Sequence, residues 1–274
     1  MLELNRVRAD RWMRRRRACA LADGKPGGHP VHGLLEEEVT QILALFEEWG
    51  DTDRSHRKLA HRGSYLGRVW VSPSSVRRVL NAHGLRLRRP KRPARSQRRP
   101  FPEWAEWKPN RIWIFDTTHF GRCGMAVVAI TDLVSRKWIC EVVSVEETST
   151  QVKLAFTRGP MCAIAQHFGR PGIPTDQAWI ETLFGHVKAE YPHLLRIRDP
   201  GLLRAEFAAV RAHYNGVMLH EGIGYVCPDD EHQGYGEQIR KARQAGLANA
   251  RQRRLACHRA NRDNPSMQEH GDVG

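Results

Sequence analysis

The chain has 274 residues, 41% of them hydrophobic, which is enough for one large domain or two to three small ones and argues against wholesale disorder. Its 44 Lys and Arg against 30 Asp and Glu leave a formal net charge of +14. This excess indicates a polyanionic partner, nucleic acid ahead of an anionic membrane. No apolar run reaches the roughly 18 residues of a transmembrane helix, and the first residues lack a signal-peptide pattern.

The cysteines and histidines do not form the pattern of a zinc site. No CxxC pair occurs, and no His/Cys cluster has zinc-ligand spacing. We therefore expect reduced thiols at all six cysteines, which are Cys19, Cys123, Cys140, Cys162, Cys227 and Cys257.

The first 84 residues divide into a basic arm and a helical domain. Residues 1–33 contain the run Arg14–Arg17 and then a Pro/Gly-rich stretch that breaks any helix, so we interpret them as an arm. Residues 34–84 carry apolar residues at helical spacing from Leu35 to Phe46, a second short helix over 55–61, and a loop around Gly63 and Gly67.

The third helix of this domain has the features of a DNA-reading helix. Ser72 is a good N-cap, Pro73 takes the first helical position, and Gly84 supplies a left-handed stop. An apolar inner face and a Ser/Arg outer face are what a helix-turn-helix recognition element needs, although a generic helical bundle gives the same pattern. The outer-face residues expected to contact DNA are Ser74, Ser75, Arg77 and Arg78.

Residues 85–103 form a basic linker. Eight Lys or Arg and no acid lie between Arg86 and Arg99, so no core can form there. The linker is either simply solvated or able to follow DNA phosphates. In the second case the contacts come from Arg88, Arg89, Lys91 and Arg92.

The rest of the chain has an α/β pattern. Three short apolar runs, at 112–118, 125–130 and 138–145, predict strands joined by antiparallel hairpins. Helices are expected over 150–156, 176–190 and 200–215. Strands followed by helices, with an acid on the first strand, are typical of an α/β domain.

Two carboxylates stand where metal-dependent phosphodiester chemistry needs them. Asp116 ends the first apolar run, and Glu181 lies on the 176–190 helix seven residues before Lys188, on the same helical face, with Gly185 between them. Mg²⁺ prefers carboxylate oxygens, and an ammonium group beside them suits a phosphate backbone. Asp116 alone would more simply be a turn-capping residue.

Four motifs in order resemble the integrase-core transposases of bacterial insertion sequences, relatives of retroviral integrases with a DDE metal triad. They run from about Trp104 to Pro228. The motifs are Trp113-Asp116-Thr117, the hairpin Asp132 to Lys137, the helix Pro174 to Lys188, and Tyr214-Asn215 with His220.

The resemblance implies a fold and an activity. The fold is an RNase H-like integrase core over 104–228, a mixed sheet flanked by helices, preceded by the all-α helix-turn-helix domain and followed by a basic helical tail over 229–274. The activity is cleavage of element ends and strand transfer into target DNA with two Mg²⁺ or Mn²⁺ ions. The partners are double-stranded DNA and further copies of the chain, in the bacterial cytoplasm at the nucleoid and without a membrane.

The resemblance also assigns roles to single residues. Asp116 and Glu181 bind metal, and Lys188 contacts DNA. Asp132 is a hairpin residue and Asp176 a helix cap. The residues that brace the last helix of the core are Tyr214, Asn215 and His220, and Trp113 completes the first-strand motif.

The second aspartate of the triad has no counterpart at its usual place. The family spacing falls on Glu146, 35 residues before Glu181, yet this residue directly follows the third strand. The stretch from Phe156 to Pro174 contains no acid and is too short for a further strand with its crossovers. We interpret this as an internal deletion near 157–161 that leaves catalysis weak or absent.

Three other functions remain open at this stage. A non-catalytic DNA-binding protein that recognises element ends explains the helical domain and the linker. Another RNase H-like nuclease leaves the upstream helix unexplained, and a transcription factor leaves the motifs around Asp116 and Glu181 unexplained.

Overall fold

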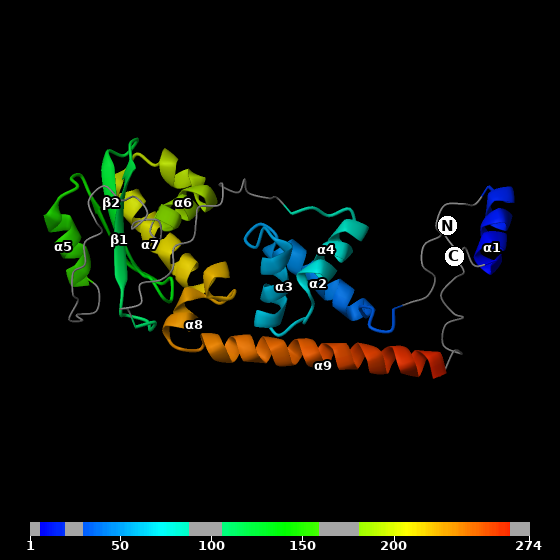
Figure 1. Ribbon diagram of the computed structural model, residues 1–274. Coiled ribbons are helices and arrows are strands. Elements are labelled where there is room, and N and C mark those ends of the chain that lie inside the picture. Colours follow the sequence, from blue (N-terminus) through cyan, green and yellow to red (C-terminus); the bar gives the residue numbers. More distant parts are fainter. Residues whose placement is uncertain (1–5, 20–29, 88–105, 159–180, 264–274) are drawn as a thin grey trace. The chain divides into compact units, whose positions relative to one another are not determined.

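The computed structural model describes residues 6–19, 30–87, 106–158 and 181–263 (Figure 1). The chain divides into two compact units, residues 1–34 with 251–274, and residues 35–250. None of the described helices is both long and apolar enough to cross a membrane. In the first unit, helix α1 (Arg6–Arg17) occupies part of the expected arm, and four of its seven arginines, Arg14 to Arg17, lie in the last turn, where the helix dipole favours cations.

The second unit begins with three short helices, α2 (Glu36–Trp49), α3 (His56–Tyr65) and α4 (Pro73–Ala82). The expected start and end of α4 are confirmed: the Ser72 side chain accepts from Ser75 N, and Gly84 has φ +69°. The helices pack through buried aliphatic side chains, which are Ile42, Leu45, Leu59, Val69, Val71, Val76, Val79 and Leu80.

The expected loop at Gly63 is wrong, because Gly63 lies inside α3, which continues to Tyr65. A Cβ atom at this position would lie 2.7 Å from Val69 Cγ1 and 3.0 Å from both Val69 O and Leu45 Cδ1. The glycine therefore allows close packing within the helix instead of ending it. The turn begins after α3, where Gly67 has φ +68°.

Three antiparallel strands form the sheet, in the order β1-β2-β3, which confirms the predicted hairpins. The strands are β1 (Trp113–Phe120), β2 (Met125–Asp132) and β3 (Trp138–Ser144). Every residue of the central strand β2 is buried. Gly124 (φ +66°) and Arg136 (φ +63°) adopt left-handed conformations in the two connecting turns.

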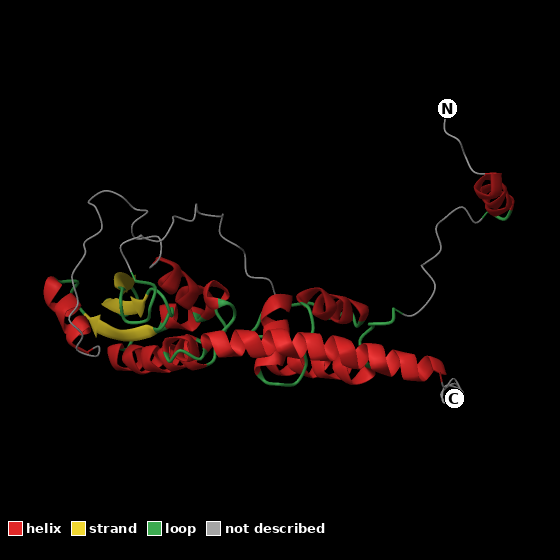
Figure 2. Ribbon diagram, turned by 60° about the horizontal axis from the view of Figure 1, so that its bottom comes forward, coloured by secondary structure: helices red, strands yellow, loops and turns green. Residues whose placement is uncertain are grey.

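Helices cover both faces of this sheet, so that the unit is a mixed α/β structure (Figure 2). Helix α5 (Ser149–Arg158) packs on one face through Ala155, against Val128 and Ile130 of β2. Helices α6 (Glu181–Glu190) and α7 (Pro200–Gly216) pack on the other face, against Val127 and Ala129. The 176–190 helix of the sequence prediction is thus described only from residue 181 onward.

Short helices lead from this core to one long helix. They are η2 (Pro192–Arg196), η3 (Glu221–Ile223) and α8 (Pro228–His232), and the long helix is α9 (Gly236–Asp263). Gly224 follows η3 with φ +74°. This left-handed turn lets the chain reverse into the His220–Val226 bridge.

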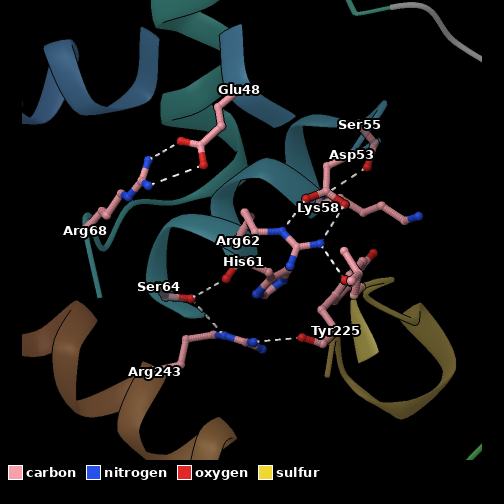
Figure 3. Close-up of polar contacts among 11 residues, drawn as sticks. Glu48, Asp53, Ser55, Lys58, His61, Arg62, Ser64, Arg68, Tyr225 and Arg243 are labelled. Atoms are coloured by element: carbon pink, nitrogen blue, oxygen red, sulfur yellow. Dashed lines mark hydrogen bonds and ion pairs between the residues drawn. The ribbon is translucent and has the colours of Figure 1, made fainter. Parts of the chain in front are cut away.

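A buried ion pair joins the helical segment to the end of the core (Figure 3). Arg62 Nε donates to Asp53 Oδ2 at 2.7 Å, and a terminal guanidinium nitrogen donates to Val217 O, just after α7, at 2.7 Å. The guanidinium carbon lies 4.1 Å from the centre of the Trp49 ring. The Asp53 and Arg62 side chains are 0% and 2% exposed, so neither charge is solvated by water and each is stabilised by the other.

The first half of α9 is part of the same unit. Arg243 donates to Ser64 Oγ on α3 at 3.0 Å, and to the carbonyl oxygens of Gly224 and Tyr225 at 2.8 and 2.9 Å. Tyr65 donates to an Asp230 carboxylate oxygen. The stretch expected as a tail from residue 229 therefore begins as a packed element, and its polar contacts reach residues far apart in the sequence.

Replacing Arg62 with Ala should lower the free energy of unfolding by about 3–5 kcal/mol, because Asp53 is left as a buried charge without its ion-pair partner. Urea unfolding monitored by circular dichroism measures this loss. The double variant Asp53→Leu/Arg62→Met removes both charges and should lose less than Arg62→Ala. An equal or larger loss in the double variant would contradict this account.

Alanine at two helical glycines should have opposite effects on stability. Gly63→Ala should lower the free energy of unfolding by about 1–3 kcal/mol, because Val69 and Leu45 must move. Gly185→Ala, where an added Cβ meets no atom within 4 Å, should raise it by about 0.5–1 kcal/mol. The same unfolding measurement on both variants tests the packing role of Gly63.

Candidate active site

Asp116 lies in the middle of β1, half-buried, opposite Ala129 of β2. Side chains alternate along a strand, so Asp116 shares a face with Thr118 and Phe120. Phe120 packs in the core formed with α6 and α7. The carboxylate of Asp116 therefore lies on the α6/α7 side of the sheet, where its Oδ1 accepts a hydrogen bond from Thr117 N at 2.8 Å.

Helix α6 brings Lys188 against the same strand. The helix is fixed to the sheet by Leu183, Phe184 and Val187, which are all buried in the core. On this helix the Lys188 ammonium donates to Thr118 Oγ1, and it lies 5.5 Å from the centre of the Phe120 ring. Lys188 thus contacts β1 two residues beyond Asp116, on the face that carries its carboxylate.

Glu181 begins α6, seven residues before Lys188, and its side chain lies outside the described residues. Asp176 and the proposed deletion point fall on or next to the stretch 159–180, which is also outside them. The structure therefore places Asp116 and Lys188 on the same face of the core, and it places Glu181 only by its backbone at the start of α6.

The carboxylates that follow Asp116 have other partners. Asp132 is fully buried and accepts hydrogen bonds from four donors, Asn110 N, Val134 N, Ser135 N and Ser135 Oγ. Glu141 lies 2.7 Å from Arg211 on α7, and Glu147 lies 3.2 Å from His119. Glu146 is exposed in the bend after β3.

A metal ion at this site would need several carboxylate side chains close together. In the parts of the chain that the structure describes, no three His, Cys, Asp or Glu side chains lie together in an arrangement that could hold a metal ion. A Mg²⁺ ion needs several oxygen ligands, and a two-metal site needs shared carboxylates. Of the two ligands that the resemblance implies, the described side chains include Asp116 alone.

The Tyr-Asn…His motif links α7 to β3. The Asn215 side chain accepts from Trp138 N and donates to Trp138 O, both at 2.8 Å, so it pairs with the backbone of β3 as a neighbouring strand would. The Tyr214 ring packs edge-on against the rings of Trp138 and His220, with centroids 5.9 and 4.5 Å away. Trp113 lies elsewhere, stacked on Phe156 of α5 on the opposite side of the sheet.

His220 is held as a neutral imidazole. Burial lowers the pKa of His220 to about 3, and the neighbouring Lys58, His186 and Arg136 act in the same direction. Its backbone N–H donates to Val226 O at 3.2 Å. Local sequence patterns give no sign of this environment, because it comes from residues on α3, α6 and the β2–β3 turn.

The expected DNA-reading residues of α4 are not equivalent. Ser74, Arg77 and Arg78 are exposed, whereas Ser75 is only 8% exposed. The Ser75 hydroxyl lies 3.0 Å from Ser72 Oγ and accepts from Arg78 at 3.3 Å. Ser75 therefore completes the N-terminus of α4 instead of facing outward. The linker residues of the sequence prediction lie outside the described residues, namely Arg88, Arg89, Lys91 and Arg92.

Comparison with known proteins identifies part of this core. Residues 162–228 match the family model of the integrase core domain. No curated protein and no solved structure matches the chain. The matched stretch contains α6 and α7, and with them Glu181, Lys188 and the Tyr214 to His220 motif, but not β1 with Asp116. The match supports an integrase-like core with an RNase H-like fold for the mixed α/β structure.

The neutral state of His220 should make stability pH-dependent. Its pKa is about 6.5 in the unfolded chain and about 3 in the fold, so below pH 6.5 the unfolded chain takes up a proton that the folded chain does not. The contribution of neutral His220 to the free energy of unfolding is therefore fully present above pH 6.5 and is lost as the pH falls toward 3. Between pH 7 and pH 5 the wild type should lose about 2 kcal/mol more than His220→Gln.

Urea unfolding at both pH values, on both proteins, measures this difference. The other histidines with lowered pKa values, His61, His186, His213 and His232, are present in both proteins and so largely cancel in the comparison. Equal pH dependence of the two proteins would show that His220 does not titrate as stated.

Proposed function

We propose that this chain is a DDE-type transposase or integrase-like protein that binds the ends of a DNA element and has weak or absent strand-transfer activity. The observation that carries the proposal is the integrase core match over 162–228, in a structure whose α6 lysine contacts the strand that bears Asp116. A lysine beside a carboxylate suits a site at which a phosphate backbone lies near bound cations.

The DNA-binding half of the proposal is supported by the distribution of charge. The net charge is +14, and exposed arginines lie on α4 at Arg77 and Arg78. The basic linker follows directly in the sequence. Phosphate contacts of this kind supply most of the affinity of non-specific DNA binding. We propose double-stranded DNA as the partner, both element end and target, with several copies of the chain assembled on it.

The impaired catalysis follows from the carboxylates. Asp132, Glu141 and Glu147 have partners in the fold, and the segment from 159 to 175 contains no acid. Glu146, at the family spacing, lies in the exposed bend that directly follows β3 and not at the end of a further strand. Asp116 and Glu181 are then the two family positions that remain, one fewer than the triad of the family. We attribute the missing acid to an internal deletion near 157–161.

The same observation favours a second candidate, a non-catalytic DNA-binding protein that occupies element ends and so regulates an intact transposase. It differs from the first in having no residual cleavage. This candidate requires that Asp116 and Glu181 hold no functional pair of metal ions, as expected when a third carboxylate is missing.

Two assays on the full chain test the proposal. A labelled 40-base-pair duplex should bind with an affinity that falls as salt rises, with Kd on the order of 10⁻⁴ to 10⁻⁶ M at physiological salt for non-specific sequence. A labelled oligonucleotide with a free 3′-hydroxyl, incubated with supercoiled plasmid and Mg²⁺ or Mn²⁺, should show little or no joining. Asp116→Asn should leave that low level unchanged, as should the exposed-carboxylate control Glu147→Gln.

Two results would contradict the proposal in different ways. Robust metal-dependent joining that Asp116→Asn abolishes and Glu147→Gln preserves would show that another acid completes the site. Absence of duplex binding at low salt would overturn the DNA-binding function itself.

A further inference from the structure

The long helix α9 has an unusual charge distribution. It spans 28 residues, Gly236–Asp263, and from residue 238 to residue 262 it contains no acid. Helices on protein surfaces more often mix the two signs of charge, since i,i+4 pairs stabilise them. The Lys and Arg residues of this acid-free stretch are Arg240, Lys241, Arg243, Arg251, Arg253, Arg254, Arg259 and Arg262.

The cations of the first half of α9 serve the fold. Arg240 donates to Glu231 Oε2 at 2.7 Å and to Ile223 O at 2.9 Å. Arg243 is buried against Ser64 and the 224–225 turn. Lys241 pairs with Glu237 one turn earlier. Contacts within the chain therefore account for the basic residues in the first half of α9.

The second half of α9 presents three exposed arginines on one side. Arg251, Arg259 and Arg262 are all exposed. At about 100° and 1.5 Å per residue, they fall within an arc of roughly 80° and extend over roughly 16 Å of the helix. All three belong to the unit that contains residues 251–274. Between them on this side lie the partly buried Leu255 and His258, and His258 Nε2 lies 3.0 Å from Gly33 O.

The chemistry of these three arginines fits duplex DNA. B-DNA carries one negative charge per about 1.7 Å of its axis, so a 16 Å row of guanidinium groups meets several phosphates at once. Arginine binds phosphate through two parallel hydrogen bonds. Most exposed neighbours on this side are small or polar, such as Ala248 and Gln252; the two leucines near it are Leu255, partly exposed, and Leu247, 37% exposed. A membrane-surface helix would need a continuous row of bulky apolar residues in place of these two.

We propose that Arg251, Arg259 and Arg262 form a DNA-backbone contact on α9, separate from α4 and from the basic linker. The proposal rests on the proposed function only in that the chain binds DNA. A contact of this kind carries no sequence information and adds affinity and orientation. In this proposal α9 binds the DNA backbone, while other parts of the chain recognise the base sequence or cleave the DNA.

The experiment measures the salt dependence of binding by fluorescence anisotropy, with the full chain and the labelled 40-base-pair duplex. Each phosphate contact contributes about 0.9 to the slope of log K against log salt. The variant Arg251→Gln/Arg259→Gln/Arg262→Gln should lower this slope by about 2 to 3. The variant with lysine at the same three positions should retain most of the slope.

A matched control removes three exposed cations elsewhere, Lys108→Gln/Arg111→Gln/Lys153→Gln, with the same change in net charge. Its slope should stay within about 1 of the wild type, since general charge acts only weakly through screened distances. Far-ultraviolet circular dichroism of all variants checks that α9 remains helical.

Three outcomes decide between the readings. A loss of slope confined to the glutamine variant at 251, 259 and 262 supports the contact. If the glutamine variant and the wild type have equal slopes, the DNA contact on α9 is overturned while DNA binding by the chain stands. The contact is also overturned if the glutamine variant loses binding only to vesicles of phosphatidylserine and phosphatidylcholine. A wild type that does not bind the duplex at all overturns both this inference and the proposed function.

Discussion

The Arg62 guanidinium is the point at which the helical segment and the core depend on each other. It is 2% exposed and is satisfied by Asp53, by the Trp49 ring and by the carbonyl oxygen of Val217, which is 155 residues away in the sequence. A buried charge is tolerated only when all its partners are in place. The arrangement of the α2–α4 helices therefore depends on the end of α7. Arg243 makes a similar set of contacts, which join α3, the 224–225 turn and α9.

The core has its own interlocking contact, at Asn215. Its side-chain amide satisfies both backbone groups of Trp138, and Trp138 in turn packs against Tyr214 and Phe207. This arrangement holds α7 against β3, while Leu183 and Val187 hold α6 beside it. The contact of Lys188 with β1 is a consequence of that packing, so the apolar face of α6 determines the geometry of the candidate site.

Much of the fold follows from local patterns, and the exceptions have a common cause. Short apolar runs predict the three strands, and caps such as Ser72 and Gly84 predict the limits of α4. Gly63 is misread because its role depends on Val69 and Leu45, and the docking of α9 is missed because Arg243 looks like any cation of a polar helix. The candidate site shows the same difference. The strand of Asp116 and the helix of Lys188 are local features, whereas the neutral state of His220 depends on residues far from it in the sequence, such as Lys58 and Arg136.

DNA binding and strand transfer place unequal demands on such a chain. Backbone binding sums many weak, screened contacts, so it survives the loss or relocation of any one arginine. Metal-dependent transfer needs a few oxygen ligands that converge on one point, and the loss of one carboxylate leaves the rest under-coordinated. Under the proposed function, the chain keeps its net charge of +14, its packed α6 and its buried Arg62 pair while lacking one acid, and it would lose catalysis long before it loses its fold or its DNA binding.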